Sequence, residues 1–363
     1  MKILLLGGTG AMGSHLTDYL SDKGHRVVVT SRSKYEGTEY VEYRQGNAKN
    51  KEFLMEILSE QWDAIVDFMV YTVEQFSERI DLLLGATSQY FFLSSARVYN
   101  ESKEAITEES PRLLDASKDY EFLDTREYSL SKARQENILR SSKKKNWTII
   151  RPYITYNEKR LQLGNLEKEE WLYRALHGRT IVFSEDIRDH ITTLTYGLDV
   201  AAGIASLIQN QKALGETYHI TNECSYKWGE ILDIYLEVLE EKLGYRPKVV
   251  YQNLSDYQSW NTNKYQIIYD RLFDRSFDNT KINEFINTKD FAPIKIGLKK
   301  CLIDFIENPD FLPINWKNEA IKDRFTKERT HLKEINGNDQ KLRYFIYRYL
   351  KKSWIKVLER IMR

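Results

Sequence analysis

Cysteine is nearly absent from this chain of 363 residues, which contains only Cys224 and Cys301. Two isolated cysteines give neither a disulfide framework nor the paired spacing of a zinc site. Small disulfide-stapled folds are therefore excluded, and we predict that the chain holds no metal. A reducing compartment is the simplest setting for such a chain, so we expect a cytoplasmic location.

Excess charge and long apolar runs are also missing. The formal net charge is +1, so no overall basic field attracts nucleic acid, and we expect no nucleic-acid partner. No stretch approaches the roughly 20 apolar residues that span a bilayer. The apolar run from Ile3 to Leu6 is too short for a signal peptide. Hydrophobic residues make up 42% and charged residues 29%, which is ordinary for a globular protein.

The first half of the sequence alternates short apolar runs with helical patterns. Strands are predicted over 2–6, 26–30, 41–45, 64–68, 89–94 and 147–151, and helices over 11–23, 51–60, 74–84 and 126–143. This alternation predicts an α/β fold, with a Rossmann-type doubly wound parallel sheet and helices on both faces. Later signals predict helices over 198–209 and 228–243 and a strand over 217–221.

The pattern loosens after residue 155, which suggests a division into three parts. We expect residues 1–155 and 191–222 to form the dinucleotide-binding Rossmann domain. Residues 156–190 and 223–335 would form a smaller C-terminal substrate-binding region. Residues 336–363 would form a basic amphipathic C-terminal helix.

The C-terminal segment 341–363 contains eight Lys or Arg residues and one Glu. Its apolar residues Phe345, Tyr349, Trp354, Leu358 and Ile361 recur roughly as one stripe. A basic amphipathic helix of this kind can lie on an anionic membrane surface. It can equally dock on the body of the protein or on a second subunit with its basic face in solvent, and both interpretations remain open.

A glycine-rich segment follows the first predicted strand directly. Gly7, Gly10 and Gly13 lie at a G-x-x-G-x-x-G spacing between a strand and a helix. In a dinucleotide-binding loop, one glycine permits the tight turn, one lets the backbone approach the pyrophosphate, and one lets the helix pack closely on the strand. The helix start then offers amide N–H groups to the phosphates. The pattern favours a dinucleotide site over a structural turn in another kind of α/β protein.

The end of the second strand indicates which dinucleotide binds. An acidic residue there usually binds the ribose hydroxyls of NAD, whereas an arginine accommodates the 2′-phosphate of NADP. The segment reads VVTSRSK over 28–34 and contains no carboxylate. Ser31 can donate to a phosphate, and Arg32 can pair with it bidentately. NADP is therefore favoured, with NAD as the alternative.

Tyr128 and Lys132 are four residues apart on a predicted helix and therefore share a face. A tyrosine with the ordinary pKa near ~10 is a poor base at neutral pH, and a nearby ammonium lowers that pKa. Such a tyrosine can exchange a proton with a sugar or alcohol oxygen while hydride moves at the carbon. Ser95, at the end of an apolar strand, would hydrogen-bond the same oxygen. The alternative is an exposed helix face without chemistry.

These motifs resemble the extended short-chain dehydrogenase/reductases of the NAD(P)-dependent epimerase/dehydratase family, whose best-known members act on nucleotide sugars. The similar segments are GGTGAMG, IVDFMV, FFLSSARVY, YSLSK, IIRPYITY and GETYHIT, and they span roughly residues 1–235. The resemblance implies that Ser95, Tyr128 and Lys132 are catalytic. It also implies a homodimer formed through the helices that carry Tyr128 and residues 74–84. Together with the loop and the second strand, it predicts a cofactor site formed by Gly7, Thr9, Gly10, Ala11, Met12, Gly13, Ser31, Arg32, Asn47, Phe68, Met69, Val70, Tyr128, Lys132 and Tyr153.

Departures from the family pattern narrow the expected chemistry. The 4,6-dehydratases of the family carry Thr-Asp-Glu after the fifth strand, where this chain has Ser95-Ala96-Arg97. Dehydration is therefore not expected, because the acid and base are missing. What remains is 4-epimerisation of a nucleotide-activated sugar through a transient keto sugar, or reduction of a keto sugar. An Asn that helps 4-epimerases bind the nucleotide is replaced by Ile154.

Two arginines are candidate substrate contacts. Arg97 follows the predicted catalytic Ser95, where it can meet an anionic group or brace the loop. Arg188 can bind a substrate diphosphate or pair with the adjacent Asp189. Two other functions stay open: an NADPH-dependent reductase of a non-sugar carbonyl compound, and a protein that binds NADP without turnover.

Overall fold

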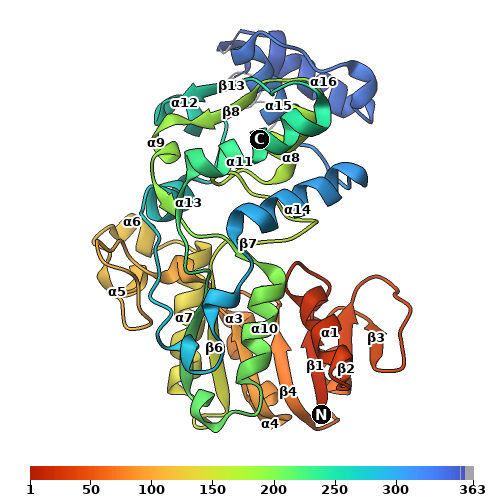
Figure 1. The fold of residues 1–363 in the computed structure, drawn as a ribbon, viewed down its shortest axis with the longest axis vertical. Coiled ribbons are helices and arrows are strands. Elements are labelled where there is room, and N and C mark those ends of the chain that lie inside the picture. Colours follow the sequence, from red (N-terminus) through yellow and green to blue (C-terminus); the bar gives the residue numbers. More distant parts are fainter. Residues whose placement is uncertain (352, 356–363) are drawn as a thin grey trace. The chain divides into compact units, whose positions relative to one another are not determined.

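The computed structural model describes residues 1–351 and 353–355 (Figure 1). The chain forms two compact units. Unit 1 contains residues 1–160, 191–226 and 273–298, and unit 2 contains 161–190, 227–272 and the chain from 299 onward. Residues 273–298, which were expected in the substrate-binding region, thus pack with unit 1.

Unit 1 is built on a seven-stranded sheet whose strands all run parallel, in the order β11-β6-β5-β4-β1-β2-β3 (Figure 1). The chain reverses its direction of growth between β3 and β4, as in a doubly wound fold. The predicted Rossmann-type sheet is therefore confirmed. The strands are β1 Lys2–Leu6, β2 Arg26–Ser31, β3 Val41–Gln45, β4 Trp62–Asp67, β5 Thr87–Leu93, β6 Trp147–Pro152 and β11 Glu216–Ile220.

Helices cover both faces of the sheet, which explains why its central strands, such as β1, carry continuous apolar runs. Ile3 and Leu5 of β1 pack on one face with α1 and α10, whereas Leu4 and Leu6 pack on the other with α2, α3, α4 and α7. The helices are α1 Gly13–Asp22, α2 Lys51–Ile57, α3 Val73–Ser77, α4 Ile80–Gly85, α5 Leu113–Ala116, α6 Tyr120–Leu123, α7 Tyr128–Ser141 and α10 Gly197–Leu207. The short strands β7 Thr155–Tyr156 and β10 Thr195–Tyr196 pair beside them.

The single helix predicted over 74–84 is interrupted. Thr72 caps α3 in a reciprocal pair of hydrogen bonds with Gln75, and α4 restarts after Arg79. The Arg79 guanidinium turns back over the ring of Tyr71, 4.6 Å from its centroid. The sequence over 74–84 has the hydrophobic pattern of one helix because both short helices pack on the same face of the sheet.

Unit 2 contains a small parallel pair of strands, β8 and β13, with helices around it. Its elements are α8 Lys168–Leu176, β8 Ile181–Ser184, α9 Glu185–Arg188, α11 Trp228–Leu243, β13 Val249–Gln252, α12 Leu254–Gln258, α13 Lys264–Gln266, α15 Trp316–Thr326 and α16 Asn338–Tyr349, and α14 Ile294–Glu307 leads the chain into this unit. An apolar cluster that includes Tyr173, Trp316 and Tyr344 joins α8, α15 and α16.

The C-terminal segment differs from the single helix predicted over 336–363. α16 ends at Tyr349, because Leu350 has an extended backbone (φ −72°, ψ 150°). The guanidinium of Arg324 donates to the Leu350 carbonyl, which fixes the chain as it leaves the helix. Residue 352 and residues 356–363, with Leu358 and Ile361 of the predicted stripe, lie outside the described residues.

In the part of the chain that the structure describes, no helix has the length and apolarity needed to cross a membrane.

Candidate functional site

The glycine-rich loop has the backbone that a phosphate loop requires. Gly7 adopts a φ of +69°, a conformation that favours glycine. A side chain on Gly7 would come within 2.6 Å of the Met69 sulfur, and one on Gly13 within 2.5 Å of the Gly8 carbonyl oxygen. The space beside Gly10 is open. The turn, the close packing of α1 on the loop and the open approach to the backbone are all present.

The N-terminus of α1 faces this loop without a side-chain cap. Met12 occupies the cap position and accepts no side-chain hydrogen bond from the first turn. Thr9 and Gly10 are exposed, and Ala11 is half-buried. The Gly7 amide, by contrast, is tied to the hydroxyl of Thr30 at 2.9 Å. These residues fit a dinucleotide pyrophosphate, because the amides of an uncapped helix start can bind phosphate oxygens.

A cavity of about 330 Å³ lies beside the loop, where the adenosine end of a dinucleotide would bind. Its lining includes the predicted cofactor residues Ser31, Arg32 and Asn47, together with Lys49. Sequence reasoning missed Lys49, although it lies only two residues after Asn47 at the same edge of the sheet. The lining residues are Gly7, Thr9, Thr30, Ser31, Arg32, Gly46, Asn47, Ala48, Lys49 and Met69, which include two cations and no carboxylate.

Tyr128 and Lys132 lie on one face of α7, as their spacing predicted. The Lys132 ammonium is 5.9 Å from the centre of the Tyr128 ring. Lys132 is buried, and its ammonium donates to the carbonyl oxygen of Leu93 at 2.6 Å. The C-terminal end of β5 thus holds the lysine, because Leu93 is the last residue of that strand.

The pKa of Tyr128 differs from the sequence expectation. Burial raises the pKa of its hydroxyl above the ordinary value, against the opposing influence of Arg97, Arg160 and a hydrogen bond with Ser95. The ammonium expected to lower this pKa, Lys132, is 5.9 Å from the ring. Arg97 is closer, with its guanidinium carbon 5.3 Å from the ring centre. Arg160 was not singled out from the sequence, because no motif marks it.

Arg97 braces the loop after Ser95. Its guanidinium donates to Glu127 at 2.6 Å, and its backbone N–H donates to the Ser95 hydroxyl at 3.2 Å. The second oxygen of Glu127 accepts from the backbone N–H of Ser129 at 2.5 Å and so caps α7. Glu127 is a carboxylate near Tyr128 that the sequence analysis missed, and both of its oxygens already accept hydrogen bonds.

A second cavity, of about 450 Å³, opens at the N-terminal end of α7. Tyr128 and Lys132 line it from one side, and Val70 lines it from the segment that follows β4.

The other predicted cofactor residues do not line this cavity. Phe68 and Met69, in the same segment as Val70, are half-buried. Tyr153 is buried, with its ring centre 5.3 Å from that of Phe277.

Glu136 supports the strand end next to the predicted catalytic Ser95 from within the core. It accepts from Arg151 at 2.8 and 2.6 Å, from Arg112 at 3.1 Å and from the Ser94 hydroxyl at 2.6 Å. Burial opposes ionisation of Glu136, but Arg151 and these hydrogen bonds hold its pKa below the ordinary value. The network ties Ser94, next to predicted catalytic Ser95, to α7.

Arg188 belongs to unit 2, where it forms the ion pair with Asp189 that the sequence analysis kept as an alternative. The two side chains meet at 3.1 and 3.0 Å. The Arg188 guanidinium also lies over Tyr251, 5.2 Å from the ring centre. A phosphate role for Arg188 stays a prediction. Among the described residues, no group of His, Cys, Asp and Glu is arranged to hold a metal ion.

Comparison with known proteins agrees with this geometry. Residues 3–84 match the profile of the NAD dependent epimerase/dehydratase family. Over these residues, the chain is similar to the epimerase/dehydratase family. The resemblance drawn from the sequence motifs is thereby confirmed.

Two curated relatives cover parts of the chain. The chloroplast stem-loop binding protein of 41 kDa b from Arabidopsis thaliana is 26% identical over 238 residues, which are 61% of this chain and 59% of that protein. The UDP-glucose 4-epimerase of Streptococcus mutans is 34% identical over 80 residues, 20% of this chain and 24% of the relative. The matches therefore span less than two thirds of either relative's length.

Solved structures extend the likeness of fold. An epimerase from Methanothermobacter thermautotrophicus has a TM-score of 0.66 at 17% identity, with 85% of this chain and 92% of that one covered. The UDP-glucuronic acid 4-epimerase of Bacillus cereus, in complex with UDP-glucuronic acid and NAD, has a TM-score of 0.63 at 17% identity, with 85% and 99% covered. At these identities the likeness concerns the fold.

Proposed function

We propose that the protein is an NAD(P)-dependent epimerase or keto-sugar reductase of the extended short-chain dehydrogenase type, acting on a nucleotide-activated sugar. One observation carries the proposal: Tyr128 and Lys132 line one cavity, with Ser95 beside Tyr128. The names of two proteins similar to this chain, a UDP-glucose 4-epimerase and a UDP-glucuronic acid 4-epimerase, support the substrate class.

The side chains divide the work at a single substrate carbon. The bound nicotinamide cofactor supplies the acceptor and donor of hydride. Tyr128 takes the proton from the substrate hydroxyl or returns it, and Ser95 donates a hydrogen bond to the same oxygen. Since burial raises the pKa of Tyr128, the cations around it must favour the phenolate for the proton to move near neutral pH. Arg97 and Arg160 act on Tyr128 in this sense, and we propose that the Lys132 ammonium, 5.9 Å from the ring centre, acts with them.

NADP is the cofactor that the adenosine-end cavity favours. Arg32 and Lys49 line it together with the Ser31 hydroxyl, and no carboxylate lines it to bind ribose hydroxyls in the manner of NAD enzymes. Two cations and a hydroxyl are the groups that bind a 2′-phosphate. NAD remains the alternative, because the matched family is described as NAD dependent.

Two arginines remain candidate substrate contacts: Arg188 would bind the diphosphate, and Arg97 would contact the sugar end. A homodimer through α3, α4 and α7 would follow the family pattern, and we place the enzyme in the cytoplasm. Sedimentation at two protein concentrations tests the dimer, and a monomer at both would exclude it.

A panel of UDP-, GDP-, CDP- and dTDP-sugars tests the function. A product isomer without net change of cofactor identifies an epimerase, and stoichiometric loss of NADPH identifies a reductase. Turnover of simple ketones but of no sugar nucleotide would favour the non-sugar reductase. Tight NADP binding without any turnover would favour the non-catalytic alternative.

As a second proposal, we infer that the exposed surface of α16 contacts an anionic membrane. Its buried residues Tyr344 and Tyr347 pack within unit 2, whereas Leu342, Phe345 and Tyr349 are 59%, 52% and 49% exposed. Exposed apolar side chains in a strongly basic segment suit an interface of lipid and anionic headgroups.

Vesicle flotation tests this proposal. Full-length protein should float with vesicles that contain anionic lipid and stay behind with neutral vesicles, and Phe345→Glu should abolish flotation. Leu312→Glu is the matched control, because Leu312 is an exposed leucine of unit 2 outside α16. Equal flotation of wild type and Phe345→Glu would overturn the membrane contact.

A further inference from the structure

A buried carboxylate lies between the predicted catalytic lysine and the segment that borders the cofactor site. Asp67 is the last residue of β4 and is 1% exposed. A carboxylate so deeply buried is costly unless hydrogen bonds and opposite charge stabilise it. Asp67 lies in the segment IVDFMV, but the sequence analysis gave it no role of its own.

Asp67 organises the turn that follows β4. One of its oxygens accepts from the backbone N–H of Met69 at 2.9 Å and from the Tyr71 hydroxyl at 3.4 Å. Its other oxygen accepts from the Tyr90 hydroxyl at 2.8 Å. Met69 in turn lies against Gly7 of the phosphate loop, and Tyr71 lines the cavity of Tyr128. The carboxylate therefore fixes a segment that borders both cavities.

Asp67 also lies beside the strand end that holds Lys132. In the sheet, Asp67 is the partner of Phe92. The Lys132 ammonium lies over the Phe92 ring, 4.6 Å from its centre, and donates to the next residue, Leu93. Among the described residues, Lys132 forms no ion pair; burial disfavours its ammonium form, and Asp67 and Glu136 favour that form from beyond ion-pair distance.

The charged groups around Lys132 leave Asp67 as the main source of that field. Glu136, one turn along α7, is already neutralised by Arg151 and Arg112. Burial raises the pKa of three nearby tyrosines, Tyr128, Tyr71 and Tyr90, so their hydroxyls are neutral at ordinary pH. The positive charge of Arg79 opposes this rise at Tyr71 and Tyr90 without reversing it. Asp67 therefore has a larger effect on Lys132 than Glu136 has.

We propose that Asp67 is a positioning residue, which keeps Lys132 in its ammonium form and joins it to the turn that borders the cofactor site. Burial lowers the pKa of Lys132 to about 8, against the opposing pull of Asp67 and Glu136. Removing the Asp67 charge must lower that pKa further. The lysine would then lose its proton closer to neutral pH. Once neutral, it would no longer stabilise the Tyr128 phenolate. This inference rests on the proposed function of Tyr128 and Lys132.

Asp67→Asn tests the proposal, since it keeps the side-chain size and one carbonyl acceptor while removing the charge. The basic limb of the pH profile of kcat should move to lower pH by about one unit, the lower end of the effect of one nearby opposite charge. Burial raises the pKa of Asp67 itself to about 6, so wild type and variant should converge below that pH. If kcat fell by the same factor at every pH, the role of Asp67 would be structural only, and the proposal would be overturned.

Tyr90→Phe is the matched control, because it removes one hydrogen bond to Asp67 and leaves the charge in place. Its basic limb should coincide with that of wild type. A readout independent of turnover is NMR titration of isotope-labelled lysine, with the Lys132 signal assigned through Lys132→Met. An unchanged Lys132 titration in Asp67→Asn contradicts the proposal, whether or not any sugar is turned over. A protein without turnover but with a shifted titration would refute the function and keep the role of Asp67.

Discussion

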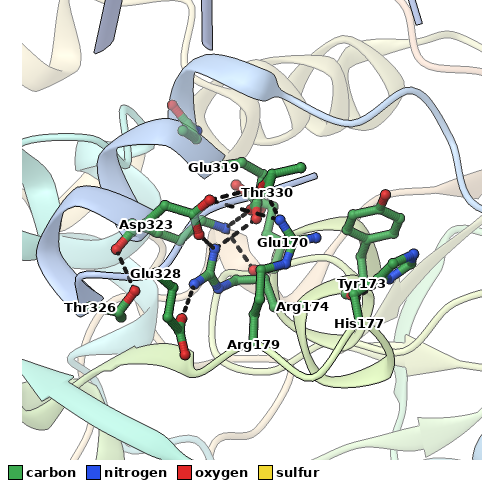
Figure 2. A network of polar contacts seen from close by, with 12 residues as sticks. Glu170, Tyr173, Arg174, His177, Arg179, Glu319, Asp323, Thr326, Glu328 and Thr330 are labelled. Atoms are coloured by element: carbon green, nitrogen blue, oxygen red, sulfur yellow. Dashed lines mark hydrogen bonds and ion pairs between the residues drawn. The ribbon is translucent and has the colours of Figure 1, made fainter. Parts of the chain in front are cut away.

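Two buried cations, Arg174 in unit 2 and Lys132 in unit 1, have opposite surroundings. Arg174 donates to Glu319 and Asp323 at 2.8 Å and to Glu328 at 3.0 Å, and Figure 2 shows these carboxylates converging on it. Lys132 is equally buried, yet its ammonium donates to a backbone carbonyl oxygen, that of Leu93. One cation is saturated with anions, and the other lines a cavity next to a tyrosine.

This difference separates a structural charge from one available for chemistry. The Arg174 guanidinium holds α8 to α15 and already donates four hydrogen bonds, three of them to carboxylates. A lysine stabilised by distant charge keeps a pKa near the range where enzymes work. Burial of a charged side chain alone therefore does not indicate a catalytic site. A cavity beside the charged group distinguishes Lys132 from Arg174.

Removing the Tyr128 hydroxyl should have the largest effect. Tyr128→Phe should lower kcat by at least about a hundredfold, because proton transfer by a positioned side chain contributes ~10²–10⁴. Cofactor affinity, followed by fluorescence titration, should stay nearly intact. Tyr120→Phe, at a site that is 82% exposed, should change neither quantity. Retained activity in Tyr128→Phe would place the chemistry on another helix.

Breaking the saturated network should cost stability instead of activity. Arg174→Ala removes the guanidinium that buried Glu319 and Asp323 share, and removing one partner of a buried pair destabilises by about 3–5 kcal/mol. Chemical denaturation measures the loss. Arg246→Ala, which removes the exposed pairs with Asp233 and Glu240, should cost less than about 1 kcal/mol. Equal costs would mean that burial does not distinguish the two networks.

The adenosine-end cavity gives a smaller effect, on cofactor choice. Arg32→Ala should weaken NADP binding roughly tenfold or more, because a hydrogen bond to a charged group contributes about 1.5–3 kcal/mol. NAD binding should hardly change. Calorimetric titration of both cofactors measures the ratio, and an equal loss for both would remove the 2′-phosphate assignment.

The smallest effect concerns strain beside the Arg174 network. Lys327, which precedes Glu328, ends α15 with a φ of +61°. Lys327→Gly should stabilise the protein by about 1 kcal/mol, because glycine adopts this conformation without the steric penalty of a side chain. Gly244→Ala, at the end of α11 where φ is +75°, should destabilise by a similar amount. A loss of stability in Lys327→Gly would show that its side chain contributes more than its strain costs.

The fold of unit 1 could be predicted because its signals are local. The loop from Gly7 to Gly13 and the spacing of Tyr128 and Lys132 both concern residues close together in sequence, and local spacing determines which side chains share a face. Glu127, Lys49 and Asp67 each lie within two residues of a predicted site residue, yet they escaped prediction because spacing alone does not tell which neighbouring charged side chain is buried or hydrogen-bonded at the site. In unit 2 the helix over 228–243 was predicted, but the rest escaped, because its core depends on contacts such as Arg174 with Glu319, which are distant in sequence.

The central claim is that the site of Tyr128 and Lys132 exchanges hydride with a sugar nucleotide. The most direct test mixes protein carrying oxidised cofactor with each sugar nucleotide and follows the absorbance of reduced nicotinamide. The account predicts that this absorbance appears with at least one sugar in the wild type and is lost in Tyr128→Phe. No reduced nicotinamide with any sugar, or the same signal in Tyr128→Phe, would contradict it.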